Sequence, residues 1–453
     1  MRPLAVTLAM ASGRGRALLV VAATALSSAL LLIAVSIARL VDGPTTTTTC
    51  NGSTCTTYGN VVPDGFTNMG LIGPLQESGT RGGAVFGVVL LVLPLLLLLD
   101  QAVRLGSSSR QRRYSALAIA GATRSDLRRW GALEVGIPAA VGGLLGVPVW
   151  LVLRYLLGTL LADGGQALVP TATGPGPWTL LILAGITGYG VLVGLRSGAR
   201  APALLRSTRR LRRAPRPWGL VALLGAAILL VPAISSATEL LLFATLGLVV
   251  LGLALLSPWL AYRVALLLVP RAGSAELLLA LRRLIADPGP PGRAAAATGA
   301  VALAGGVIGP LIGAFAASGS DADYYALPVM LAAILSTIAA GIVAATLAIH
   351  STETVLERRR ELAALVATGI PTSTVSRSQL LEIWVATLPL ATLATLLGSF
   401  GYWVLGGMEV TLLWPIASIV VTLGVIASTG WVTHRLVRPW VRDAVHPANL
   451  RTE

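Results

Sequence analysis

The sequence predicts an all-α integral membrane protein of about ten transmembrane helices, and three observations support this fold class. The 453 residues are 55% hydrophobic and only 12% charged, whereas about a quarter of the residues of a water-soluble protein are charged. Ten apolar runs of about 20 residues, long enough to cross a bilayer, recur along the chain. The gaps between them alternate between arginine-rich and arginine-poor, as loops on opposite sides of a membrane do.

The apolar runs differ little in length, and each predicts one membrane helix. We interpret the first as a retained helix, because it is too long for a signal peptide and lacks the right cleavage site. The fifth and sixth are joined only by Ser235–Thr238. The runs span residues 18–38, 83–103, 131–153, 178–195, 218–234, 240–260, 297–317, 327–349, 379–405 and 412–434.

The distribution of charge predicts the orientation. All 34 basic residues are arginine and the net charge is +15. One side, with both termini and the gaps 104–130, 196–217, 262–296 and 350–378, holds 31 arginines and 11 acidic residues, and the other holds only Arg39, Arg81 and Arg154 with 8 acidic residues. This asymmetry places both termini in the cytoplasm and argues against nucleic acid as a partner. Arginine-only basicity with much alanine and glycine indicates a bacterial cell membrane.

The chain contains two cysteines, Cys50 and Cys55, in the hydrophilic loop 39–82. Their spacing is too isolated for a zinc site, which normally has four ligands, so no metal site is expected. On an external face they either form a local disulfide or remain free thiols. We favour the disulfide.

Two segments resemble each other at a shift of 248 residues: Arg112–Thr123 and Arg360–Pro371. Each runs from a charged cluster through Ala-Leu to a glycine, and a carboxylate, Glu134 or Glu382, follows 13 residues later. The chain therefore divides into a first four-helix unit (1–196), an arginine-rich linker with a helix pair (197–274), a second four-helix unit (275–436) and a cytoplasmic tail (437–453). No large extracellular domain is expected, because loop 39–82 is too short for one.

Each repeated segment predicts a helical stalk, a tight tip and a returning helix. Leu356–Ala367 is expected to extend the eighth membrane helix, and Gly369 and Pro371 to end it. Thr372–Thr374 offer caps for the returning helix, as do Ser125 and Asp126 after the tip at Gly121. Glu134 and Glu382 are expected at the start of helices three and nine, paired with Arg128 or Arg377. The alternative is that these are ordinary loops that only set topology.

The run Arg-Arg-Arg-Glu-Leu-Ala-Ala-Leu-Val-Ala-Thr-Gly at 358–369, followed by polar residues and Leu380-Leu381-Glu382, resembles the FtsX-like permease family. That family includes permeases of the lipoprotein-release, macrolide-exporter and bacitracin-resistance types. The resemblance extends over both four-helix units. In the first copy Tyr114-Ser115 replaces the usual Glu-Leu, although Leu117, Gly121 and Glu134 remain.

The resemblance implies an ATP-driven permease whose tips dock on two copies of a soluble ABC ATPase subunit. The ATP and Mg²⁺ belong to that partner, because a chain without lysine cannot form a Gly-x4-Gly-Lys-Ser/Thr loop, and this chain itself binds no cofactor. The expected coupling residues are Leu117, Ala118, Ala120, Gly121, Ala122, Thr123 and Arg124 in the first copy, and Leu365, Val366, Thr368, Gly369, Ile370 and Pro371 in the second. The expected activity is export of an amphiphile, namely a lipid, peptide, antibiotic or porphyrin.

Two other functions stay open. A non-transporting FtsX-like subunit that signals to an extracellular partner would have the same tips. A membrane enzyme has less support, because His350, His434 and His446 lack a catalytic spacing, and no catalytic residue is expected. External contacts to a substrate, a porphyrin in particular, would come from Tyr58, Met69, Tyr324 or Tyr325.

Overall fold

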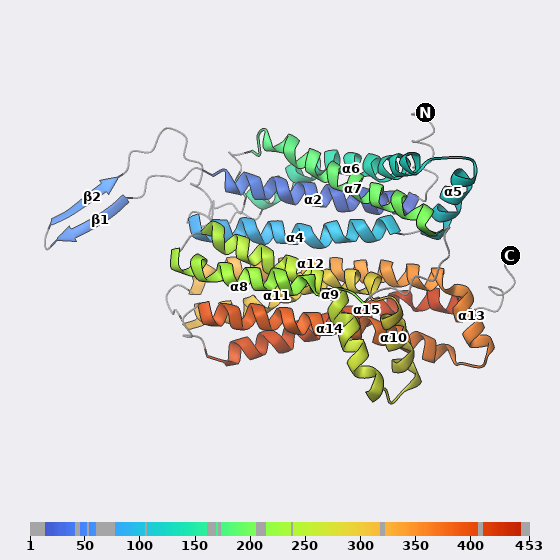
Figure 1. Cartoon of the computed structure of the whole chain (residues 1–453). Coiled ribbons are helices and arrows are strands. Elements are labelled where there is room, and N and C mark those ends of the chain that lie inside the picture. The colour runs from blue at the N-terminus through green and yellow to red at the C-terminus, as the bar shows by residue number, and fades with distance from the viewer. Residues whose placement is uncertain are drawn as a thin grey trace.

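A computed structural model describes most of the chain. The described residues are 14–40, 46–51, 54–59, 78–104, 107–160, 169–170, 174–204, 214–236, 239–317, 322–405 and 411–444. Within these ranges the chain forms long helices and one small β-hairpin. Figure 1 shows the long helices running roughly alongside one another.

The helices of the described residues fit the predicted fold class. Nine are long and apolar enough to cross a membrane, and α4 adds a shorter apolar stretch, Gly87–Asp100. The all-α, multi-span membrane fold is therefore confirmed. The helices are α2 (Arg14–Ala38), α4 (Ser78–Arg104), α5 (Ser107–Ile119), α6 (Arg124–Tyr155), α7 (Trp178–Leu204), α8 (Trp218–Ser236), α9 (Glu239–Leu268), α10 (Ala275–Ala286), α11 (Gly289–Ala317), α12 (Ala322–Glu357), α13 (Arg359–Ala367), α14 (Thr372–Leu405) and α15 (Leu413–Ala444).

The outer surface of the bundle is apolar. In α8 the side chains of Val221, Leu224, Ile228 and Val231 are all at least 60% exposed. In water such a stripe would be costly, since burying each side chain is worth about 1.5–3 kcal/mol. The exposed apolar stripe of α8 is therefore suited to contact with lipid.

The helices pack as two similar groups. In the first group α6 packs against both α2 and α7, and α2 also packs against α4. In the second, α14 packs against both α11 and α15, and α11 also packs against α12. Helix α8 packs on α9, and α9 packs on α11 and α14, so the linking pair belongs to the second group.

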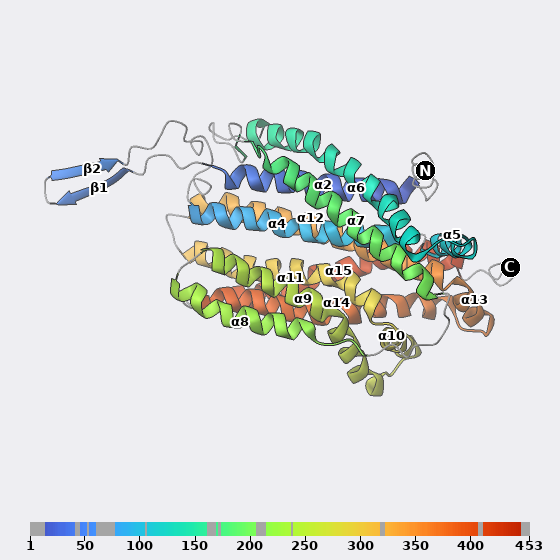
Figure 2. The same ribbon diagram turned by 45° about the horizontal axis from the view of Figure 1, so that its top comes forward.

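The two groups meet along α4 and α12, which lie side by side in Figures 1 and 2. Leu91 of α4 packs in one apolar cluster with Ala339, Ala340 and Val343 of α12. Leu99 of α4 belongs to a second cluster, against which Ile342 and Ile349 of α12 pack. This contact between the two groups is therefore built from aliphatic side chains.

Glycines allow close helix packing within each group. A Cβ atom on Gly142 would collide with Thr24 and Val21, and one on Gly146 with Ser28, so α6 and α2 approach closely. A Cβ on Gly305 would collide with Thr422, and one on Gly309 with Ser418. Small residues at helix contacts have this effect in membranes.

The loop after α2 contains a β-hairpin that the sequence pattern did not indicate. Strands β1 (Thr46–Asn51) and β2 (Thr54–Gly59) pair antiparallel, with Thr46 opposite Gly59 and Cys50 opposite Cys55. In Figure 1 the hairpin projects from one end of the bundle, and α5, α10 and α13 lie at the other.

The predicted continuous helix through Leu356–Ala367 is wrong. Helix α12 ends at Glu357, Arg358 leaves the helical conformation (φ −99°, ψ 11°), and α13 starts at Arg359. The bend allows Leu362 to join a buried cluster with Val355, Val437 and Val441. Apolar packing against the end of α15 therefore overrides the strong helical pattern of the segment.

Candidate functional site

The two repeated segments form two turns, which we call the elbows: residues 117–124 between α5 and α6, and residues 365–372 between α13 and α14. Gly121 has φ +93° and Gly369 has φ +96°, the left-handed conformation that glycine adopts without steric cost. Nothing lies within 4 Å of a Cβ placed on either glycine. Backbone conformation rather than space therefore requires glycine at both positions.

The backbone hydrogen bonds of the two elbows match at the shift of 248 residues. Gly121 N–H donates to Ala118 and Ala122 N–H to Leu117, while Gly369 N–H donates to Val366 and Ile370 N–H to Leu365. This pattern is the Schellman motif that ends many helices. The repeat seen in the sequence thus corresponds to a repeated backbone geometry.

The two helices that follow the elbows, α6 and α14, differ in the capping of their N-termini. Thr123 and Asp126 form a capping box on α6, in which the Thr123 hydroxyl accepts from the Asp126 N–H and the carboxylate of Asp126 accepts from the Thr123 N–H. Pro371 occupies the place of Thr123, and Val375 N–H donates to its carbonyl group. The expected caps Thr372–Thr374 instead form the first turn of α14.

Most of the predicted coupling residues lie on the surface. Leu117 is 38% exposed, and Ala120, Gly121, Thr123 and Arg124 are also exposed. Their neighbour Ile119, which was not predicted, is 84% exposed. In the second elbow Thr368, Gly369 and Pro371 are exposed. The remaining five residues are half-buried: Ala118, Ala122, Leu365, Val366 and Ile370. Both elbows lie at the same end of the bundle (Figures 1 and 2).

Behind the first elbow, Glu134 is held by polar groups from two other helices. Arg16 of α2 forms a 2.7 Å ion pair with the Oε1 atom of Glu134, and both side chains are at most 10% exposed. Tyr114 of α5 donates a 2.8 Å hydrogen bond to Oε2, and the Nη2 atom of Arg113 lies 3.9 Å from Oε1. These contacts tie α5 and α2 to α6.

Two expectations about the carboxylates need correction. Helix α6 starts at Arg124 and α14 at Thr372, so Glu134 and Glu382 lie in the third turn of their helices and not at the start. The helix dipole acts mainly on the first turn and does not explain them. The basic partner of Glu134 is Arg16, 118 residues earlier, and not the expected Arg128.

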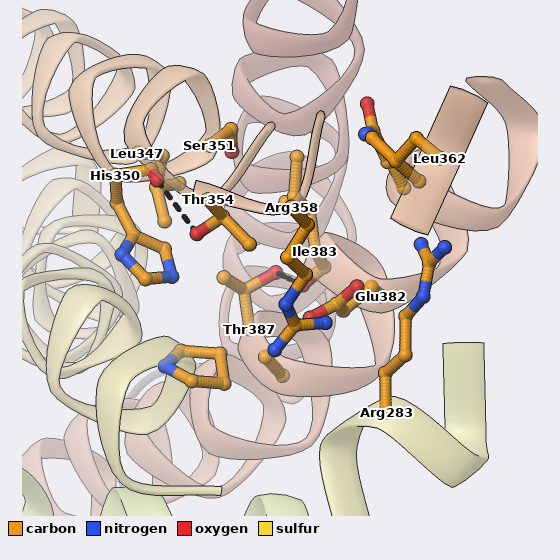
Figure 3. A pocket seen from close by; sticks show the side chains of 13 residues that line it. Arg283, Leu347, His350, Ser351, Thr354, Arg358, Leu362, Glu382, Ile383 and Thr387 are labelled. Atoms are coloured by element: carbon orange, nitrogen blue, oxygen red, sulfur yellow. Dashed lines mark hydrogen bonds between the residues drawn. The ribbon is translucent and has the colours of Figure 1, made fainter. Parts of the chain in front are cut away.

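Behind the second elbow, Glu382 lines a cavity of about 40 Å³, room for a few water molecules. Arg283, His350, Thr354 and Arg358 also line it. Figure 3 shows Arg358 beside Glu382, with Leu362 nearby and Arg283 reaching in from α10. Within the described part of the chain, no hydrogen bond or ion pair at contact distance joins the Glu382 side chain to a neighbour.

Arg283 was missed because its helix was taken for part of a loop. The signal was present: Ser274 caps α10 at the Leu277 N–H, and Leu277, Leu281 and Leu284 recur at helical spacing along one buried face. Arg283 donates a long hydrogen bond of 3.4 Å to Ser378. Burial lowers the pKa of its guanidinium, and the neighbouring Glu382 opposes this shift.

The residues expected on the external side are only partly placed. Tyr58 lies in β2, and Tyr324 and Tyr325 lie in the first turn of α12, whereas Met69 lies outside the described residues. Cys50 and Cys55 are directly opposite in the hairpin. Among the described residues no group of three His, Cys, Asp or Glu side chains could hold a metal ion.

The described structure defines a class, a multi-pass helical membrane protein with paired elbows at one end. No protein-family profile matches the chain, and no curated protein or solved structure is significantly similar to it.

Proposed function

We propose that this chain is the membrane permease subunit of an ABC transporter and that a separate ATPase subunit drives it. The observation that carries the proposal is the pair of elbows with the same backbone hydrogen bonds, 248 residues apart and at one end of the bundle. Two equivalent docking points on one chain suit a pair of identical ATPase subunits. The resemblance of residues 358–369 to FtsX-like permeases supports the same function.

The side chains at the elbows suit a protein contact. Ile119 and Leu117 are apolar and exposed, and they follow α4, whose apolar stretch ends at Asp100. Apolar side chains exposed to water at such a place are a typical contact for a protein partner. ATP-driven closure of the partner would then displace α5 and α13, and through them α6 and α14.

The two groups of helices meet along the aliphatic contact of α4 with α12. Relative motion at this contact breaks few directional bonds, so displaced elbows can rock one group against the other. Such rocking of two similar bundles underlies alternating access in many transporters. In this proposal the rocking motion exports an amphiphile that enters from the lipid of the bacterial cell membrane. The amphiphile leaves on the side opposite the arginine-rich loops.

Site-specific cross-linking tests the proposal. The tagged chain with cysteine at Ile119 or Thr368 is purified from its native membrane, and ATP hydrolysis and cross-links are measured. We expect ATPase activity and a cross-link from both positions to the nucleotide-hydrolysing subunit. Gly273→Cys, exposed but outside the elbows, is the control and should give none.

A preparation that hydrolyses no ATP and forms no cross-link at either elbow would refute the proposal. Movement of a fluorescent amphiphile in proteoliposomes then distinguishes transport from signalling. A complex that hydrolyses ATP without moving any amphiphile would favour the signalling subunit.

A further inference from the structure

Glu382 lines a cavity behind the second elbow, whereas neighbouring side chains bind its counterpart Glu134 behind the first. At the shift of 248 residues, Glu382 corresponds to Glu134 and Leu362 to Tyr114. The Tyr114 hydroxyl donates to Glu134, but Leu362 has no hydroxyl, and it lines the cavity together with Glu382. The two halves therefore differ at the same place: Tyr114 and Arg16 bind Glu134, whereas Glu382 lines a cavity.

The charged groups of this cavity leave an excess of positive charge. Two guanidinium groups, Arg283 and Arg358, and one carboxyl group, Glu382, line it, and Arg283 interacts electrostatically with the other two. A guanidinium group has five N–H donors, and Arg283 has one long hydrogen bond, to the buried Ser378. Half-buried guanidinium groups with spare donors favour an anionic ligand, and arginine suits phosphate oxygens in particular.

Part of the cavity lining comes from the ends of apolar helices, which in a bilayer lie at the level of the lipid headgroups. Its lining residues from α11, α12 and α14, such as Pro291, His350 and Gln379, come from near the elbow-side ends of three apolar helices. Leu347 and Ile383 give it an apolar side. Basic pockets between transmembrane helices on the cytoplasmic side bind phospholipid headgroups in this way.

We propose that this cavity binds the phosphodiester headgroup of an anionic phospholipid from the adjacent leaflet. Arg283 and Arg358 donate to the phosphate oxygens, and Glu382 accepts from hydroxyl groups of the headgroup. One phosphodiester carries one negative charge, which offsets positive charge of the two guanidinium groups. The first half has no such site, because Arg16 and Tyr114 already occupy the corresponding carboxylate.

Lipid titration of the purified full chain, followed by native mass spectrometry in a non-ionic detergent, tests this site. The probe is phosphatidylglycerol, and the comparison lipid is phosphatidylcholine, which has no net charge. We expect one phosphatidylglycerol per chain to bind in preference to phosphatidylcholine. Arg283→Gln or Arg358→Gln should each weaken that binding about tenfold or more, because each removes a charged hydrogen bond.

Two further variants make the test specific. Arg282→Gln removes the same charge from the exposed neighbouring position on α10 and should change the affinity less than about twofold. Leu362→Tyr places a phenol where Tyr114 lies in the first half, and it should exclude the lipid with both arginines intact. The Leu362→Tyr variant tests lipid binding in the cavity even if Arg283→Gln does not fold. The thermal unfolding midpoint of each variant shows whether it is folded.

Three outcomes would overturn the proposal. The first is equal affinity for phosphatidylglycerol in the wild type and all cavity variants. The second is equal affinity for the two lipids. The third is displacement of phosphatidylglycerol by equimolar inorganic phosphate, which would assign the cavity to a free anion.

Discussion

The hydroxyl group of Tyr114 donates a 2.8 Å hydrogen bond to the Oε2 atom of Glu134. Tyr114 is buried and belongs to α5, whereas Glu134 belongs to α6. The bond therefore spans the first elbow and fixes the two helices that it joins. Such a contact makes the first elbow stiffer than a turn held only by its backbone.

Tyr114→Phe removes this hydrogen bond and leaves the ring in place. Because the acceptor is a nearly buried carboxylate, we expect the free energy of unfolding to fall by about 1.5–3 kcal/mol. Thermal unfolding in detergent, followed by circular dichroism, measures the change. A loss below about 0.5 kcal/mol, the usual effect of a surface substitution, would contradict the role given to this bond.

Arg16→Gln removes the basic partner of Glu134. Breaking a buried ion pair on one side costs about 3–5 kcal/mol, because the remaining charge is left uncompensated. Arg113→Gln is the matched control: Arg113 is 35% exposed and lies 3.9 Å from Glu134, so its loss should cost less than about 1 kcal/mol. Equal effects of the two variants on the unfolding midpoint would refute this ranking.

Gly121→Ala and Gly369→Ala place a side chain on a residue with left-handed φ but meet no neighbouring atom. We expect each to cost about 1–2 kcal/mol of strain, measured by thermal unfolding. Gly273→Ala, also in open space and without positive φ, should be nearly neutral. A neutral result at Gly121 or Gly369 would show that the turn relaxes to another conformation.

Gly121→Arg and Gly369→Arg test the proposed coupling. The side chain extends into open space, so membrane insertion should be unchanged, while docking of the partner is blocked and ATP hydrolysis no longer responds to substrate. Gly273→Arg is the control. Normal coupled activity in both elbow variants would argue against docking at the elbows.

Cys50 and Cys55 should form a disulfide. Directly opposite residues in antiparallel strands have Cα atoms about 4.5–5.5 Å apart, which is within the range that a disulfide bridges. Alkylation with N-ethylmaleimide followed by mass spectrometry should add two labels after reduction and none before it. Labelling of the unreduced protein at both cysteines would show free thiols.

The sequence was sufficient for features that depend on local patterns. Each apolar run coincides with a helix to within one residue, and the glycines at 121 and 369 mark real turns. Hydrophobic length and the need for positive φ are properties of short segments. The bend at Arg358 was not predictable in this way. It depends on Leu362 packing against Val437 and Val441, which are distant in sequence.

The composition of the candidate site depends even more on tertiary contacts. Glu134 could be identified as unusual, but its partner Arg16 comes from another helix, and no local rule connects them. Arg283 was not predicted as a site residue because α10 is short and apolar on one face only. Such a segment does not predict a membrane helix. The difference between Tyr114 and Leu362 was visible in the alignment of the two halves. Its consequence for the two carboxylates could be recognised only once the structure showed the cavity.

Helices α8, α9 and α10 all attach to the second group of helices. The protein consequently has a larger lipid-contacting perimeter on one flank than on the other. If the groups rock, the second group, which carries the three additional helices, must displace more lipid for each degree of rotation. The first group therefore undergoes most of the tilt. Membrane thickness and stiffness would then act unequally on the two groups of helices.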